Sequence, residues 1–196
     1  MLWFHRIRFF SFVLLVLLCC LVPLGVIYTN IVKKDDITKQ ITRHLKKENI
    51  NIEDNTARTI SRVVYEESAS YGLDYRLVLA LMKIESNFKH DAVSSMGARG
   101  LLQVKPSHAK FIAQDLGIKW DGYTTLDKPD SNIKIGIHFF SQLLRDFENI
   151  NVALRAYNIG PTRVKELSQN NMQSTKGFPG LVMNEYRKNT STFPNP

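Results

Sequence analysis

The segment at residues 85–107 reads ESNFKHDAVSSMGARGLLQVKPS and follows an apolar helical pattern. Glu85 lies three residues after Met82 and seven after Val78. This spacing places the Glu85 carboxyl group on the apolar face of the helix. Loss of hydration there raises the pKa of a carboxyl group, as a general acid requires near neutral pH. The alternative is a helix-end Glu that is paired with an Arg or with a capping group.

The residues around this segment predict further helices. Asp74 is placed to cap a helix that runs to about Ser86, and Pro106 opens another. The clearest pattern runs from Asn132 to Phe147, where apolar residues follow a period of 3.6. Because no segment alternates in the way typical of a strand, we expect a mainly α fold.

A second block, ALRAYNIGPTRV, stands at residues 153–164. Together the two blocks resemble lytic transglycosylases with a catalytic domain of the soluble-lytic-transglycosylase (SLT) type, which is related to goose-type lysozyme. The resemblance covers roughly residues 58 to 168. The residues that match the family pattern are Glu85, Ser86, Phe88, Ala92, Ser94, Gly97, Ala98, Gly100, Leu101, Gln103, Ala156, Tyr157, Asn158, Gly160 and Pro161.

The resemblance implies a lysozyme-like helical domain that cleaves the β-1,4 bond between N-acetylmuramic acid and N-acetylglucosamine in peptidoglycan and forms 1,6-anhydro-muramyl ends. It implies that Glu85 acts as the sole acid and base. Ser94 and Gln103 would form hydrogen bonds with the sugar or its N-acetyl group. Tyr157 would lie near Glu85 and help to hold either Glu85 or the oxocarbenium-like sugar of the substrate. Asn158 would contact the substrate or brace the site.

The sequence departs from the family pattern at Lys105, where many members carry an apolar residue, so the resemblance does not predict the saccharide contacts at this position. Two other functions stay open. A hydrolytic muramidase on the same fold would need a second carboxyl group, which most glycosidases use. A peptidoglycan-binding or assembly protein would need no catalysis. The acidic residues that could approach Glu85 in space are Asp91, Asp115, Asp121, Asp127 and Asp130.

The segment from Phe9 to Tyr28 has no charged residue and is long enough to cross a bilayer. We expect a retained anchor in the cytoplasmic (inner) membrane, with a cleaved signal as the alternative, and the catalytic domain on the periplasmic, cell-wall side of a bacterium. The expected organisation is an N-terminal membrane anchor at residues 1–32, a charged stalk or solvated linker helix at 33–53, a lysozyme-like transglycosylase domain at 54–190 and a tail at 191–196.

The chain of 196 residues carries 26 Lys and Arg against 18 Asp and Glu, a net charge of +8. This charge suits an anionic wall, and the basic residues do not form the dense block with aromatics that nucleic-acid binding would favour. The two Cys are adjacent, and the five His show no metal spacing. We therefore expect no cofactor, no metal and no nucleic acid, with peptidoglycan strands and the membrane as partners. A place in a secretion, conjugation or wall-remodelling complex is also open.

Overall fold

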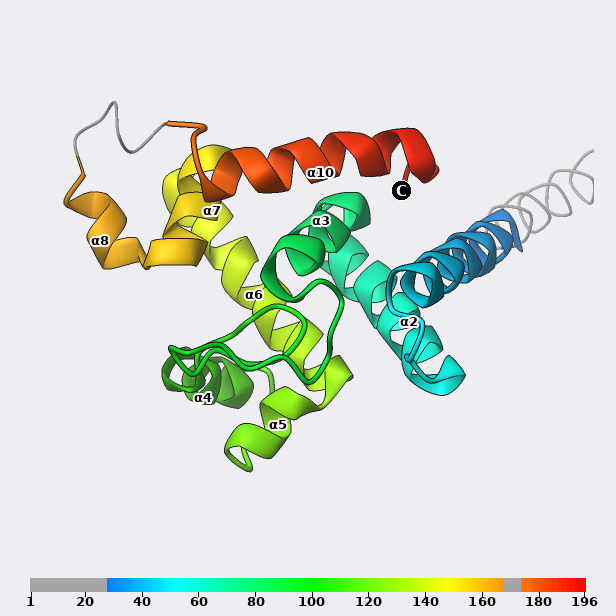
Figure 1. Cartoon of the computed structure of the whole chain (residues 1–196), viewed down its shortest axis with the longest axis horizontal. Helices are drawn as coiled ribbons and strands as arrows, with labels where there is room; N and C mark the ends of the chain where they lie inside the picture. The colour runs from blue at the N-terminus through cyan, green and yellow to red at the C-terminus, as the bar shows by residue number, and fades with distance from the viewer. Residues whose placement is uncertain (1–27, 168–173) are drawn as a thin grey trace, which may run out of the picture. The chain divides into compact units, whose positions relative to one another are not determined.

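The computed structural model describes residues 28–167 and 174–196 (Figure 1). The chain divides into two compact units, Met1–Ile37 and Thr38–Pro196. Residues 28–37 of the first unit are helical. None of the helices in the described ranges has the length and apolar character that a membrane crossing requires. Apart from Tyr28, the expected membrane segment lies outside the described residues.

The second unit is built from helices. Helical residues 38–48 come first. The helices that follow are α2 (Asp54–Ser70), α3 (Tyr75–Ser86), α4 (Pro106–Asp115), α5 (Tyr123–Asp127), α6 (Pro129–Phe147), α7 (Ile150–Ile159), α8 (Pro161–Lys165) and α10 (Phe178–Thr192). Extended pairing in the described ranges is limited to isolated bridges that join Arg99 to Val93 and to Val104. The prediction of a mainly helical fold is confirmed.

Local signals in the sequence set several helix ends. The Asp74 side chain accepts a hydrogen bond from the Arg76 backbone N–H at 2.9 Å, so Asp74 caps α3 as predicted. Pro106 occupies the first turn of α4 as expected. Helix α6 begins at Pro129, three residues before the predicted start, because proline suits the first turn of a helix.

Helix α6 is the centre of the unit, and α2, α4, α5 and α7 all pack against it (Figure 1). Helix α10 packs against α3 and α7. The apolar stripe of α6 is turned inward as its periodicity predicts. The buried apolar residues of α6 are Ile133, Ile135, Ile137, Phe140 and Leu143. The helix therefore supports both the α7 segment and the loop that precedes α4.

Residues 38–48 belong to the domain and are not a solvated linker helix, so the compact unit starts well before the predicted residue 54. Ile41 and Leu45 are both 0% exposed. The His44 ring contacts the rings of Phe88 and Phe193, with centroids 5.5 and 5.1 Å apart. The narrow apolar stripe was visible in the sequence, but its partners lie far along the chain.

The C-terminal residues, which the sequence predicts as a tail at 191–196, pack on the domain. The Tyr75 hydroxyl donates to the Pro194 carbonyl at 2.7 Å. The Arg76 guanidinium donates to the Asn195 side-chain oxygen, also at 2.7 Å. These bonds attach the chain end to the start of α3.

Candidate active site

The backbone leaves α3 in an unusual conformation directly after Glu85. Asn87 and Phe88 have φ values of 51° and 61°, in the left-handed region that non-glycine residues rarely adopt. Phe88 is only 1% exposed, so core packing of its ring holds this turn in place. Glu85 therefore lies in the last turn of a core helix, where the helix meets the following loop.

The loop between α3 and α4 is fixed by its own hydrogen bonds. The Ser94 N–H donates to the Ala98 carbonyl at 2.9 Å, and the Ser94 hydroxyl oxygen accepts from the Ala98 N–H at 3.0 Å. The Gln103 side-chain amide donates to the carbonyls of Ala92 (3.1 Å) and Gly100 (2.9 Å). Both Gln103 bonds use its N–H groups, so its side-chain oxygen is the atom that can accept from a ligand.

Asn132 of α6 fastens the loop to the core. Its side chain is fully buried, accepts from the Leu102 N–H at 2.9 Å and donates to the carbonyls of Arg99 (2.9 Å) and Leu126 (3.0 Å). The close approach depends on Gly100, because a Cβ atom there would lie 2.2 Å from the Asn132 amide nitrogen. Gly100 also has a φ of +76°, which favours glycine.

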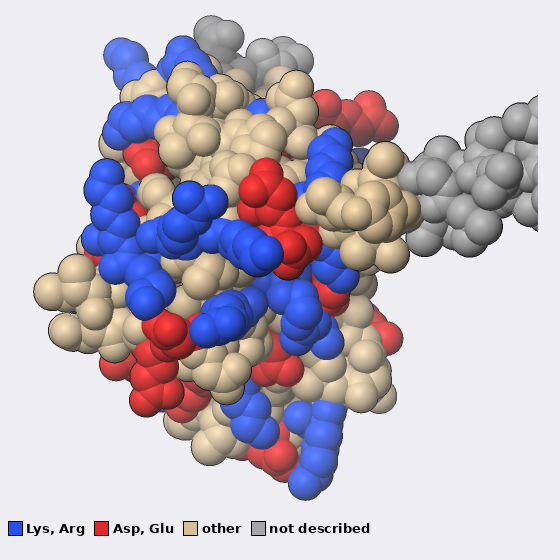
Figure 2. Space-filling view, turned by 90° about the vertical axis from the view of Figure 1, so that its right-hand side faces the viewer, with Lys and Arg blue, Asp and Glu red and all other residues tan. Residues whose placement is uncertain are grey.

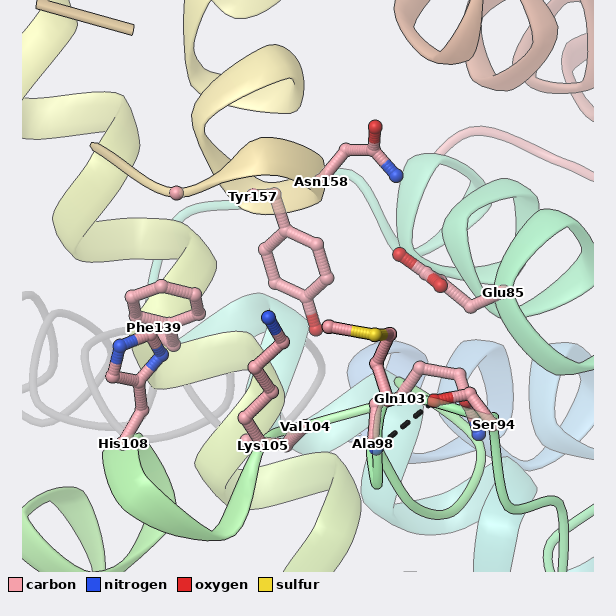
Figure 3. Close-up of a pocket in the computed structure, with 12 residues that line it drawn as sticks. Glu85, Ser94, Ala98, Gln103, Val104, Lys105, His108, Phe139, Tyr157 and Asn158 are labelled. Atoms are coloured by element: carbon pink, nitrogen blue, oxygen red, sulfur yellow. Dashed lines mark hydrogen bonds between the residues drawn. The ribbon is translucent and has the colours of Figure 1, made fainter. Parts of the chain in front are cut away.

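Helices α3, α4, α6 and α7 and this loop together line a cavity of about 240 Å³ (Figure 3). All five residues that the sequence predicted for the site line this cavity: Glu85, Ser94, Gln103, Tyr157 and Asn158. Figure 3 shows the Glu85 carboxyl group approaching from α3, while Tyr157 and Asn158 descend from α7 on another side. The fold thus brings together residues that are far apart in the sequence.

Burial raises the pKa of Glu85 from 4.5 to about 7. No other group contributes to this shift, which agrees with a carboxyl group held on the apolar face of α3. Among the described residues, none forms an ion pair or a side-chain hydrogen bond with Glu85, so the alternative of an Arg-paired helix-end residue is not supported. The predicted direction of the pKa shift is confirmed.

Tyr157 lies beside Glu85 but bonds elsewhere. Its hydroxyl donates to the Leu102 carbonyl at 2.6 Å, and its ring contacts the rings of Phe139 and Phe140. Burial, and secondarily the Glu85 charge, hold the Tyr157 pKa well above its usual value, so the phenol stays a donor. Tyr157 therefore lies near Glu85 as expected, but its hydroxyl fixes the loop and does not bond to the Glu85 carboxyl group. The alternative contact of Tyr157 with the sugar stays a prediction.

Several residues that line the cavity were not predicted for the site. Met96 lines the cavity and is 76% exposed. In the sequence it is an apolar residue between Ser94 and Gly97, which both match the family pattern, and this position could have indicated a lining residue. His108, Phe139 and Tyr157 form a row of rings, with centroids 5.3 and 5.4 Å apart. Nothing local to α6 distinguishes Phe139 from its neighbours, because only the tertiary fold turns it toward the cavity. The other unpredicted lining residues are Ala98, Val104, Lys105 and Gly160.

Glu85 is the one carboxyl group among the described residues that line the cavity. Of the acidic residues considered above, Asp127 is paired with Arg99 at 2.8 Å and Asp121 with Lys119 at 3.3 Å. In the described ranges, no group of three or more His, Cys, Asp and Glu is arranged to hold a metal ion.

Comparison with known proteins identifies relatives that share this domain. A "Transglycosylase" of Enterobacteria phage PRD1 is 34% identical over 116 residues, which are 59% of this chain and 38% of the phage protein. A "Membrane-bound lytic murein transglycosylase C" of Cronobacter sakazakii is 37% identical over 93 residues, which are 46% of this chain and 26% of that protein. The chain therefore spans well under half the length of these relatives.

The fold also resembles part of a larger solved structure. An inactive variant of the lytic transglycosylase Slt from Pseudomonas aeruginosa aligns with a TM-score of 0.57 and 27% identity, over 67% of this chain and 24% of that one. The family described as "Transglycosylase SLT domain" matches residues 62–177, which include α3, the loop after it, α6 and α7. That match covers more than half of the chain and every residue assigned to the cavity above, and on this ground the chain belongs to the transglycosylase SLT domain family.

Proposed function

We propose that this chain is a peptidoglycan lytic transglycosylase in which Glu85 is the only acid and base. The observation that carries the proposal is a single carboxyl group with a pKa of about 7, held by burial in a cleft that no other described carboxyl group lines. Near neutral pH such a group is present in both protonation states. It can therefore donate a proton in one step and accept one in the next.

In the proposed reaction, protonated Glu85 gives its proton to the oxygen that bridges N-acetylmuramic acid and N-acetylglucosamine. The bond from C1 of the muramyl ring to this oxygen breaks, and C1 gains oxocarbenium character. The Glu85 carboxylate then removes the proton of the muramyl C6 hydroxyl while its oxygen bonds to C1. The product is a 1,6-anhydro ring, Glu85 is protonated again, and no water is consumed.

The loop residues are proposed to hold the sugar in place for this reaction. The side-chain oxygen of Gln103 is available to accept from a sugar hydroxyl or N-acetyl N–H, because its amide nitrogen is bound within the loop. We assign Ser94 and Asn158, which line the same cavity, to further contacts with the substrate. Tyr157 acts as a positioning residue through its bond to the Leu102 carbonyl.

A hydrolytic muramidase remains the competing reaction on the same fold. It would need a base to activate water, and inverting and retaining enzymes use a second carboxyl group about 5–9.5 Å from the first. The cavity offers no such group among the described residues, which favours intramolecular attack. A binding or assembly protein would explain the cleft but would have no use for a carboxyl group with a raised pKa.

Mass spectrometry of muropeptides tests the proposal. The detergent-purified chain and its Glu85→Gln variant are incubated with purified peptidoglycan. We expect anhydro-muramyl ends, one water lighter than reducing ends, from the wild-type chain and none from the variant. Reducing ends would instead identify a muramidase. Glycan binding without any cleavage by the wild-type chain would favour the binding protein.

We also propose that residues 1–32 anchor the protein in the cytoplasmic membrane, with the domain from Thr38 onward on the cell-wall side. The uncharged segment from Phe9 to Tyr28 supports this, and the C. sakazakii relative is named as membrane-bound. Figure 2 views the side on which α2 lies in Figure 1 and shows Lys and Arg side chains gathered there. A groove on helices 38–48 and α2 is lined by Lys39, Arg43, Lys46 and Arg58 together with Asp54, so it carries an excess of positive charge. Such a surface suits an anionic wall or bilayer.

Fractionation and a reporter fusion test this placement. The full chain is expected in the membrane fraction after alkaline washing, and an alkaline phosphatase fused to its C-terminus is expected to be active. Recovery in the soluble fraction would contradict a retained anchor and favour a cleaved signal. An inactive fusion on a stable, membrane-bound protein would contradict the orientation.

A further inference from the structure

Lys105 is a cation in the candidate active site, and no acidic residue in the described part of the chain pairs with it. It directly precedes Pro106, the first residue of α4, and its side chain is exposed and lines the cavity. Among the described residues, none forms an ion pair with Lys105. The Lys105 side chain also makes no capping hydrogen bond to α4. The described contacts of the fold therefore do not depend on the Lys105 ammonium group.

Neighbouring residues place Lys105 beside a surface that suits a sugar ring. His108 follows it by three residues, and the His108, Phe139 and Tyr157 rings form the aromatic row described above. In Figure 3 the Lys105 side chain extends into the cavity alongside Phe139 and Tyr157, while Glu85 approaches from the other side. The aromatic faces can pack against the apolar face of a sugar, and Lys105 lies where a substituent of that sugar would project.

Glu85 does not neutralise Lys105. The raised pKa of Glu85 has burial as its cause, with no contribution from a nearby cation. Had the Lys105 ammonium been close to the Glu85 carboxylate, it would have favoured the charged form and lowered this pKa. No other described carboxyl group lines the cavity. The cleft thus holds a positive charge that no carboxylate in the described ranges pairs with, and this charge is available to an anionic group of a ligand.

We infer that Lys105 binds a carboxylate of the glycan substrate and so makes the cleft prefer anionic over neutral glycan. The inference rests on the proposed function, because it takes peptidoglycan as the ligand. Two carboxylates share the required chemistry. One is the lactyl carboxylate of a muramyl residue that lacks its stem peptide, and the other belongs to the stem peptide itself.

Binding measurements in a Glu85→Gln background test the pairing without cleavage. The probes are a peptide-free glycan fragment with free lactyl carboxylates, the same fragment after amidation, a peptide-bearing fragment, and a chito-oligosaccharide of equal length, which has no carboxyl group. Replacement of Lys105 by Met is expected to weaken binding of a carboxylate-bearing fragment about three- to fivefold, the range of an exposed ion pair. Binding of the two neutral probes is expected to stay unchanged.

Two further variants serve as controls. Lys105→Arg keeps the charge and is expected to keep the preference for carboxylates. Lys110→Met removes the same charge from the exposed surface of α4 and is expected to change nothing, because Lys110 does not line the cavity. At about 0.5 M salt, the effect of Lys105→Met should shrink, since exposed charges are screened.

Each outcome has a defined meaning. A loss confined to the peptide-free fragment identifies the lactyl carboxylate, and a loss confined to the peptide-bearing fragment identifies the stem peptide. Equal loss on neutral and anionic probes, no loss on any probe, or no binding of any glycan would overturn the pairing. Carboxylate-dependent binding in the Glu85→Gln background, together with a failure of the wild-type chain to form anhydro ends, would refute the proposed reaction and leave the pairing intact.

Discussion

The raised pKa of Glu85 makes a prediction about stability that does not depend on the reaction. Glu85 holds its proton more tightly in the folded chain, with a pKa of about 7, than in an unfolded chain, where the value is 4.5. Its contribution to stability is therefore complete below about pH 4.5 and is lost as the pH rises through about 7. Glu85→Gln has no proton to lose there. The variant should become more stable relative to the wild-type chain as the pH rises.

The size of this effect follows from the two pKa values. Their difference corresponds to about 3 kcal/mol for a fully enclosed carboxyl group, at about 1.4 kcal/mol for each pH unit. The Glu85 side chain is only partly exposed, but solvent still reaches it, and screening reduces the expected change to about 1–2 kcal/mol. The difference in the free energy of unfolding between the variant and the wild-type chain should grow by that amount from about pH 4 to about pH 8.

Urea unfolding of a fragment that spans Thr38–Pro196, the compact unit, measures this difference. The contributions of the other titrating groups to the pH dependence of unfolding cancel in this difference, because both proteins contain the same groups. Glu166→Gln controls for the loss of one negative charge at an exposed position outside the cleft. A difference that stays flat across this pH range would refute the burial of Glu85 and, with it, the electrostatic basis of the proposed acid. A difference that grows equally for the Glu166 control would attribute the effect to net charge.

Three further tests address the architecture around the candidate active site. Gly100→Ala forces a Cβ atom against the buried Asn132 amide of α6 and should lower the free energy of unfolding by about 3 kcal/mol or more. Gly97 has the same φ of +76° but open space around it, so Gly97→Ala should lower the free energy of unfolding by only about 1 kcal/mol. Comparable losses in urea unfolding would show that the close approach does not matter. Tyr157→Phe removes a hydrogen bond to the loop backbone and should cost about 1 kcal/mol while keeping peptidoglycan cleavage within about tenfold of wild type. A loss of cleavage as large as that of Glu85→Gln would assign the phenol a direct role. A fragment of residues 51–196 lacks the two fully buried apolar side chains of helix 38–48, Ile41 and Leu45. It should be about 4 kcal/mol less stable than a fragment that retains this helix. Equal thermal stabilities of the two fragments would support the prediction that residues 38–48 form a solvated linker helix.

The sequence predicted features whose causes are local or periodic. The α6 stripe fixed which face of that helix turns inward, and Asp74 and Pro106 marked helix starts at the observed positions. The burial of Glu85 also followed from local spacing, because its position on α3 is determined by Met82 and Val78. The family pattern then predicted the residues that meet Glu85 across the cavity, which periodicity alone does not specify.

Features that depend on distant partners were missed. Helix 38–48 is rich in charged residues and shows only a narrow apolar stripe, so its burial depends on partners such as Phe88 and Phe193, far along the chain. The same limit applies to the bond of Tyr157. Nothing in the segment around Tyr157 indicates that its hydroxyl reaches the Leu102 carbonyl rather than the Glu85 carboxyl group, because that choice is made by the loop conformation.

The proposed reaction requires one carboxyl group to serve two opposite steps, and the surroundings of Glu85 are compatible with both. If Tyr157 or a cation bonded directly to Glu85, the bond would favour one protonation state and oppose the other. The structure instead directs the Tyr157 hydroxyl to the loop, the Arg99 guanidinium to Asp127, and no described side chain to Glu85. Burial alone then brings the pKa near neutrality, where donating and accepting a proton have similar costs. The inferred role of Lys105 is compatible with this balance, because no cation contributes to the raised pKa of Glu85.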